Sequence, residues 1–102
     1  MNLGIITTSR ADYFIYRPLL TRLELDHFFQ LTIIVLGQHL YDNSFNEDSL
    51  KNTKVIKGSA SFKYTQDPTG ISMAMGETTK AAAEVLATNK FDCIFVLGDR
   101  YE

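Results

Sequence analysis

Three short polar segments of the chain carry residue types that could do chemistry. They are Thr7–Asp12 (TTSRAD), Gly37–His39 (GQH) and Gly98–Glu102 (GDRYE). Each segment follows a run of apolar residues, which is typical of a loop that leaves a buried strand. Together they supply hydroxyls, guanidinium groups, an imidazole and carboxylates, so they could bind an anion and move a proton.

The Thr7–Asp12 segment is predicted to bind phosphate. It joins a predicted strand to the N-terminus of a helix, where free backbone N–H groups and the hydroxyl of Ser9 favour an anion. Arg10 adds a forked donor that matches phosphate oxygens. The alternative is that Thr8 and Ser9 only cap the helix while Arg10 points to solvent. The motifs G-x-x-x-x-G-K-[ST] and G-x-G-x-x-G are absent, which argues against ATP in a P-loop and against a dinucleotide in the usual fingerprint.

Asp99 is the candidate catalytic residue of the last segment. A carboxylate at the carboxyl end of a buried strand is partly shielded from water and can serve as a general acid or base. Gly98 before it would let backbone or ligand approach closely. The alternative is that Asp99 and Arg100 form a surface ion pair that contributes little.

His39 could donate to a phosphate or exchange a proton near neutral pH, although a lone histidine in a loop is more often solvated or structural. We expect Cys93 to be a small hydrophobe inside a strand, and Met73 and Met75 to belong to the core. The acidic residues between positions 42 and 48 do not have the spacing of a calcium loop. We expect neither a metal nor a cofactor.

The order of elements predicts an α/β fold with a parallel, Rossmann-like sheet. Short apolar runs predict strands at Leu3–Thr7, Leu31–Leu36, Thr53–Lys57 and Cys93–Leu97. The third run is polar at both ends, which indicates an edge strand. Right-handed crossovers favour the strand order 3-2-1-4. That order places the loops after the first and fourth strands beside the switch point, where open α/β sheets bind ligands.

Two helices are predicted from apolar residues at helical spacing. In the first, the stripe is Tyr16, Leu19, Leu20 and Leu23, and Asp12 is the expected N-cap. Pro18 would remove a backbone hydrogen bond, so this helix should start near Arg17 or bend there. The second is expected from about Gly70 to Thr88, with its stripe at Ile71, Met75, Ala82, Val85 and Leu86. Between positions 41 and 52 we expect a loop with at most a short helix.

The composition is that of an average domain with one core. The chain has 102 residues, 10 Lys and Arg against 12 Asp and Glu, and a formal net charge of -2. This balance leaves no basic face for duplex nucleic acid. The single cysteine excludes an internal disulfide, and neither an 18-residue apolar run nor a charged leader is present. We therefore expect a cytoplasmic protein with no membrane partner.

Three segments of the sequence resemble the N-terminus of the UDP-N-acetylglucosamine 2-epimerases. They are Thr8–Tyr13 with Arg17–Leu20, then Val35–Leu40 (VLGQHL), and last Val96–Glu102 (VLGDRYE). The closest likeness is to the hydrolysing branch, which feeds the synthesis of sialic and related nonulosonic acids. The resemblance implies two Rossmann-like domains of the glycosyltransferase-B type, with a sugar nucleotide in the cleft between them, and a homo-oligomer. Since it reaches only the first part of a family member, residues 1–102 are expected to be an incomplete N-terminal domain.

The reaction that the resemblance implies begins when UDP-N-acetylglucosamine loses its C2 proton and UDP. Water then adds to the 2-acetamidoglucal, which yields N-acetylmannosamine. By resemblance, Arg10 would contact the diphosphate, Asp99 would belong to the acid/base set, and Arg100 and His39 would line the same cleft. Ile15 replaces a lysine that some family members carry. Because the family's further catalytic groups lie beyond Glu102, we expect this polypeptide alone not to turn over sugar nucleotide.

Three alternatives stay open at this point. The substrate could be the UDP-diacetamido-trideoxy sugar used toward legionaminic acid. The chain could instead be a non-catalytic flavodoxin-like or receiver-like module, although a receiver needs two acidic residues where Thr8, Ser9 and Arg10 stand. Lastly, it could be a truncated chain whose sheet edge pairs with itself or with a missing partner.

Overall fold

The computed structural model describes residues 1–42, 45, 50–59 and 65–98. Within these ranges the strands are β1 (Asn2–Thr7), β2 (Gln30–Val35), β3 (Lys54–Lys57) and β4 (Cys93–Val96). The helices are α1 (Arg10–Glu24), α2 (Gln38–Asp42) and α3 (Pro68–Thr88). Each predicted strand is found with its ends shifted by one residue at most. Helix α2 overlaps the segment expected from position 41 only at its last two residues, and it contains His39, which was expected in a loop.

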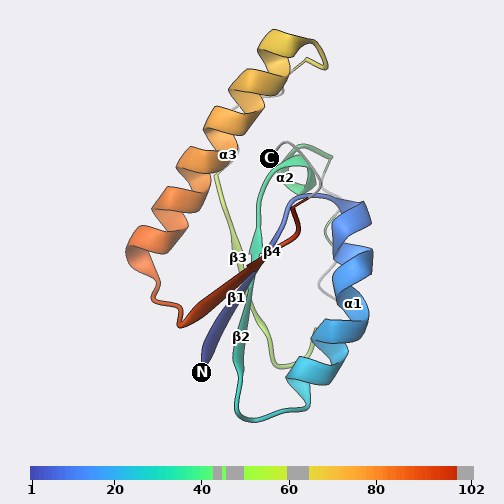
Figure 1. Cartoon of the computed structure of the whole chain (residues 1–102), viewed down its shortest axis with the longest axis vertical. Coiled ribbons are helices and arrows are strands. Elements are labelled where there is room, and N and C mark those ends of the chain that lie inside the picture. Colours follow the sequence, from blue (N-terminus) through green and yellow to red (C-terminus); the bar gives the residue numbers. More distant parts are fainter. Residues whose placement is uncertain (43–44, 46–49, 60–64, 99–102) are drawn as a thin grey trace.

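The strands form one parallel sheet in the order β3-β2-β1-β4, as predicted. The register pairs Ile5 of β1 with Ile33 of β2 on one side and with Phe95 of β4 on the other. Helix α1 covers one face of the sheet and α3 covers the other (Figure 1). The α/β, Rossmann-like fold class is therefore confirmed, and β3 is an edge strand as its polar ends indicated.

The two faces of the sheet carry cores of different size. On the α1 side the core consists of nine buried residues, namely Leu3, Ile5, Tyr13, Tyr16, Leu20, Leu23, Leu31, Ile33 and Val35. On the α3 side it consists of Ile34, Leu36, Ala81 and Val85, with partly buried neighbours. Because β1 and β2 lie in the middle of the sheet, both of their faces are covered, which explains their nearly continuous apolar sequence.

Helix α1 begins at Arg10, so of the two effects expected of Pro18 the start near Arg17 is wrong. Its N-cap is Ser9, whose side chain accepts a hydrogen bond from the backbone N–H of Asp12. Asp12 is therefore the third residue of the helix and not its N-cap.

Pro18 lies inside α1 without ending it. A proline in the interior of a helix leaves unpaired the carbonyl four residues earlier, which here belongs to Phe14. Both Pro18 and Phe14 lie on the exposed side of the helix, where water can satisfy that carbonyl. Packing of the opposite face on the sheet then outweighs the lost hydrogen bond.

The apolar stripe predicted for α3 is wrong except at Val85 and, in part, at Ile71 and Ala82. The residues of α3 that are buried are mostly small: Gly70, Ala74, Thr78, Ala81 and Val85. Met73, Met75 and Leu86 are 50%, 43% and 42% exposed, so the two methionines are not core residues.

A close approach at one point explains the small residues of α3. A Cβ placed on Gly58, just after β3, would lie 3.3 Å from Ala81 Cβ and would also clash with the side chain of Leu36. The helix thus rests directly on the sheet, and large side chains fit only on its outer side. On α1, similarly, the predicted core residue Leu19 is 41% exposed.

Strand β4 is less covered than its apolar sequence indicated. Phe95 and Val96 are 43% and 66% exposed, and Cys93 is exposed. The interpretation of Cys93 as a packed hydrophobe is therefore wrong. Among the described residues, β4 has a neighbour only at β1, so one of its edges is not paired. None of the helices in the described residues is long and apolar enough to cross a membrane.

Candidate functional site

The loops that follow β1 and β2 lie against each other at the carboxyl edge of the sheet. The backbone N–H of Leu36 donates to the carbonyl of Thr7 at 3.0 Å, and that of His39 donates to the carbonyl of Thr8 at 3.1 Å. These bonds extend the pairing of β1 with β2 past the ends of both strands. Two of the three polar segments singled out in the sequence are thereby joined.

Gly37 makes this close approach possible. Its φ is +60°, a left-handed conformation that side chains disfavour. A Cβ at this position would lie 2.9 Å from Thr8 Cβ and 3.1 Å from the carbonyl oxygen of Thr8. Only glycine satisfies both demands without a shift of the backbone.

Asp12 turns its carboxylate back onto the loop that precedes α1. One oxygen, Oδ1, accepts from the backbone N–H of Ser9 at 3.0 Å. The other, Oδ2, accepts from the N–H and from the hydroxyl of Thr8, each at 3.0 Å. Since Ser9 in turn accepts from the N–H of Asp12, the two residues form a capping box. The expectation that the backbone N–H groups of this loop are free is wrong for Thr8 and Ser9, because Asp12 already binds them.

Thr7 links this carboxylate to His39 on the neighbouring loop. The Thr7 hydroxyl lies 2.8 Å from Asp12 Oδ1 and 2.9 Å from His39 Nε2. All three side chains are buried, with Thr7 0%, His39 2% and Asp12 4% exposed. We call Asp12, Thr7 and His39 the buried triad. It ties the start of α1, the end of β1 and the start of α2 together.

The pKa of the Asp12 carboxyl lies below its ordinary value of 3.8. Burial alone would raise this pKa, but the hydrogen bonds donated by Thr7, Thr8 and Ser9 together outweigh burial. The carboxyl is therefore ionised at neutral pH. It can only accept hydrogen bonds, which suits the donors that surround it.

The pKa of His39 lies below its ordinary value of 6.5 because the ring is buried. The negative charges of Asp12 and Asp42 and the carbonyl of Ser9 act in the opposite direction without cancelling the effect of burial. Tyr13 and Phe45 pack edge-on against the ring, with centroids at 6.4 and 5.4 Å. The ring is thus neutral at pH 7 and shielded from water.

Arg10 stands outside the buried triad, on an exposed hollow. The hollow has a volume of about 480 Å³ and is lined by Ser9, Arg10, Ala11, Phe14 and Gln38. The guanidinium carbon of Arg10 lies 5.5 Å from the centre of the Phe14 ring. Arg17 contacts the same ring at 5.8 Å but does not line the hollow. Arg10 is therefore available to an anion at the start of α1, where the N–H groups of Arg10 and Ala11 lack helical partners.

The structure brings together some of the predicted site residues and does not reach others. Ser9 and Arg10 lie side by side at the hollow, and His39 lies behind it, inside the protein. Asp99 and Arg100 lie outside the described residues. At Gly98, the last described residue, an added Cβ would meet no described atom within 4 Å. The approach of a ligand to Gly98 stays a prediction.

Sequence reasoning missed the roles of Thr7 and Asp12. The signal was present, because Ser9-Arg10-Ala11-Asp12 has the S-x-x-D spacing of a capping box before an apolar run. The participation of Phe45 had no such signal, since its contacts with Tyr13 and His39 depend on how a distant segment folds back.

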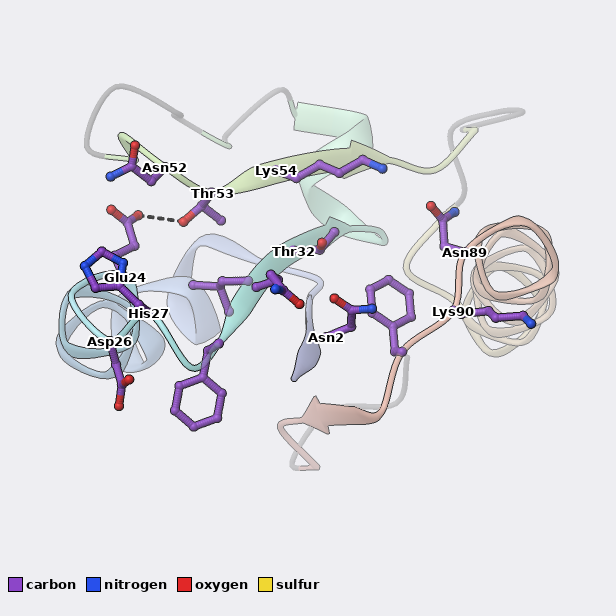
Figure 2. A pocket seen from close by; sticks show the side chains of 14 residues that line it. Asn2, Glu24, Asp26, His27, Thr32, Asn52, Thr53, Lys54, Asn89 and Lys90 are labelled. Carbon is purple, nitrogen blue, oxygen red and sulfur yellow. Dashed lines mark hydrogen bonds between the residues drawn. The ribbon is translucent and has the colours of Figure 1, made fainter.

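A larger hollow of about 710 Å³ lies at the opposite edge of the sheet, where the strands begin. Figure 2 shows Glu24 and His27 on one side of it and Asn89 and Lys90 on the other, with Glu24 accepting a 2.7 Å hydrogen bond from Thr53. Open α/β sheets bind their ligands at the carboxyl ends of the strands. We therefore place the candidate site at the smaller hollow beside Arg10. In the described ranges, no group of three or more His, Cys, Asp or Glu side chains could hold a metal ion.

No family model matches the chain. Over 100 residues the chain is 34% identical to the "Polysialic acid biosynthesis protein P7" of Escherichia coli. The chain is a distant homologue of that protein. The match covers 95% of this chain and 26% of P7, so the chain spans about a quarter of the length of its relative. The name of P7 agrees with the expected relation to sialic acid biosynthesis.

Proposed function

We propose that the chain is the diphosphate-binding part of a hydrolysing UDP-N-acetylglucosamine 2-epimerase. The observation that carries this proposal is the homology to P7, which extends over 95% of the chain. P7 is named for polysialic acid biosynthesis. The proposed reaction releases N-acetylmannosamine, and the hydrolysing branch of the family feeds sialic acid synthesis.

The geometry at the carboxyl edge supports a phosphate group as the ligand. Arg10 is exposed on a hollow at the N-terminus of a 15-residue helix. An arginine and a helix N-terminus both favour phosphate oxygens. A hydrogen bond between a guanidinium and a phosphate is charge-assisted and contributes about 1.5–3 kcal/mol, or about 10- to 100-fold in binding.

In the proposed reaction a base removes the C2 proton of the sugar. The electron pair of that C–H bond forms the C1=C2 double bond, and the C1–O bond breaks with its electrons passing to the diphosphate of UDP. Water then adds its hydroxyl to C1 while a proton returns to C2 on the opposite face, which gives N-acetylmannosamine. Arg10 and Arg100 neutralise the departing diphosphate, and Asp99 belongs to the acid/base set. His39 is buried, so we assign it no contact with the substrate.

The test is turnover by a chimera in which this chain replaces the homologous segment of P7. UDP and N-acetylmannosamine released from UDP-N-acetylglucosamine are measured, with unaltered P7 assayed in parallel. The chimera is expected to be active, and Asp99→Asn should lower kcat by at least about 100-fold because a positioned acid or base contributes that much. An active chimera in which Asp99→Asn has no effect would remove Asp99 from the mechanism. A folded but inactive chimera, beside active P7, would contradict the proposal as a whole.

The same assay distinguishes the substrate. The UDP-diacetamido-trideoxy sugar is offered beside UDP-N-acetylglucosamine at equal concentration. The proposal predicts a higher kcat/KM for UDP-N-acetylglucosamine. A reversed preference would assign the chain to the legionaminic acid branch.

A further inference from the structure

The buried triad has no part in the proposed chemistry, yet it holds a carboxylate and an imidazole inside the protein. Both groups are fully enclosed, with Asp12 4% and His39 2% exposed. Ionisable side chains are rarely buried unless they are paired. Their placement therefore calls for a structural reason at this edge of the sheet.

Each end of the triad is next in sequence to a residue that lines the hollow. Asp12 binds the N–H of Ser9, which immediately precedes Arg10, and His39 immediately follows Gln38. Arg10 and Gln38 line the hollow from two different helices, α1 and α2. Backbone bonds of Leu36 and His39 already join the two loops. The Thr7 hydroxyl adds a side-chain link between Asp12 at the start of α1 and His39 at the start of α2.

We propose that Asp12 is a positioning residue which, through Thr7 and His39, holds the Ser9–Arg10 turn against the Gly37–Gln38 turn so that Arg10 and Gln38 converge on one phosphate group. The inference rests on the proposed function only for the identity of the ligand. Its structural content is that the hydroxyl of Thr7 transmits the position of Asp12 to α2.

Hydrogen bonding determines which atom of His39 carries the proton. The Thr7 hydroxyl has one hydrogen, and the ionised Asp12 carboxylate can only accept it. Since that hydrogen points at Asp12, we assign the donor role at this contact to His39 Nε2, 2.9 Å from the Thr7 oxygen. The carbonyl of Ser9 also accepts from the ring. The neutral ring therefore carries its proton on Nε2. This assignment gives the triad a spectroscopic signature that is independent of any ligand.

A direct bond of this kind is stiffer than apolar contact, because a hydrogen bond fixes direction as well as distance. A misplacement of about 1 Å in a binding or catalytic group can cost about 100-fold in rate. Loss of the Thr7 hydroxyl should thus weaken phosphate binding by about tenfold even when the chain still folds.

The test compares Thr7→Val, which keeps the shape and removes the hydroxyl, with Thr7→Ser, which keeps the hydroxyl. Thr78→Val is the matched control, since Thr78 is a buried threonine of α3 on the other face of the sheet. Three quantities are measured by NMR on the full chain: the Nε2 proton and ¹⁵N shifts of His39, the amide shifts of Arg10 and Gln38 without ligand, and the dissociation constant of UDP from the change of those amide shifts on titration.

The proposal predicts an Nε2-bound proton on His39 in the native chain and in Thr7→Ser. In Thr7→Val this signature should change, the amide shifts of Arg10 and Gln38 should move, and UDP should bind about tenfold more weakly. Thr78→Val should leave all three as in the native chain. Wild-type UDP affinity in a folded Thr7→Val variant would overturn the proposal, as would a Thr7→Ser variant that loses as much as Thr7→Val.

Two further outcomes can be distinguished from a failure of this proposal. If the native chain binds no UDP, the proposed function fails, but the shifts of Arg10 and Gln38 still decide whether Thr7 couples the two turns. If Thr7→Val does not fold, Asp12→Asn takes its place, because an amide keeps the shape but has only one oxygen for the donors of Thr7, Thr8 and Ser9. Asp12→Asn should then move the shifts of Gln38, and an unchanged Gln38 would overturn the proposal.

Discussion

The hydroxyl of Thr7, the last residue of β1, donates a 2.8 Å hydrogen bond to Oδ1 of Asp12 in the first turn of α1. This bond connects the end of the strand to the first turn of the helix inside the protein. The same carboxylate accepts hydrogen bonds from the backbone N–H groups of Thr8 and Ser9. An external anion must therefore be bound by Arg10 and the groups around the hollow.

Removal of the Thr7 hydroxyl should destabilise the fold. Thr7 is completely buried, and Thr7→Val leaves both Asp12 Oδ1 and His39 Nε2 without this partner. A buried polar group that loses its partner costs about 1–3 kcal/mol. Urea unfolding should show a loss of that size for Thr7→Val, whereas Thr7→Ser should lose less. Equal stability of the valine variant and the native chain would show that the bonds add nothing to the fold.

Gly37→Ala should destabilise the chain by more than 1 kcal/mol. The left-handed conformation costs an alanine about 1–2 kcal/mol, and its Cβ would meet Thr8 at 2.9 Å. The control is Gly76→Ala in α3, where a Cβ would meet nothing within 4 Å. There the higher helix propensity of alanine should stabilise the chain by about 0.5–1 kcal/mol. Thermal unfolding of both variants checks the opposite signs, and a neutral Gly37→Ala would contradict the described turn.

Stability should fall in two steps as the pH decreases. Burial lowers the pKa of His39 below 6.5, so below that pH the unfolded chain binds a proton that the folded chain rejects. The free energy of unfolding therefore decreases as the pH drops below about 6.5 and levels off below the folded pKa. Asp12 has a pKa below 3.8 because of its hydrogen bonds, so the stability it provides is lost as the pH falls from about 4 through its folded pKa.

Urea unfolding between pH 8 and pH 3 measures both steps. His39→Gln should abolish the first step and keep the second, while Asp12→Asn should do the reverse. The charged groups that face His39 are Asp12 of α1 and Asp42 of α2. In Asp12→Asn the ring loses a neighbouring charge that favours its protonation, so its folded pKa falls further below 6.5. The first step should then still begin near pH 6.5, but it should extend to lower pH and become larger. A first step that persists in His39→Gln would assign it to another group.

The strand order could be predicted because it depends on chain order and handedness. Apolar runs separated by helical patterns require crossovers, and the polar ends of Lys54–Lys57 mark an edge. The burial of α3 could not be predicted in the same way. Its stripe is set by the close approach of Ala81 to Gly58 and Leu36, which favours small residues, and a hydrophobicity pattern gives more weight to Met75 and Leu86.

The meeting of the loops after β1 and β2 could be predicted, but the way their side chains pack could be predicted only in part. Parallel strands bring their following loops to one edge, so the meeting of Ser9 with the Gly37–His39 segment followed from the topology. The burial of His39 did not follow, because it depends on Thr7, Tyr13 and Phe45 enclosing the ring from three segments of the chain.

Titration of the chain with UDP, followed by NMR, tests the proposed site most directly. Arg10→Gln is compared with Arg17→Gln, because both arginines contact the Phe14 ring and only Arg10 lines the hollow. The proposed site predicts that UDP shifts the amides of Arg10, Ala11 and Gln38, that Arg10→Gln weakens binding by about 10- to 100-fold, and that Arg17→Gln leaves it unchanged. Equal affinities of the native chain and Arg10→Gln, or UDP shifts confined to the larger hollow around Glu24 and Lys90, would contradict it.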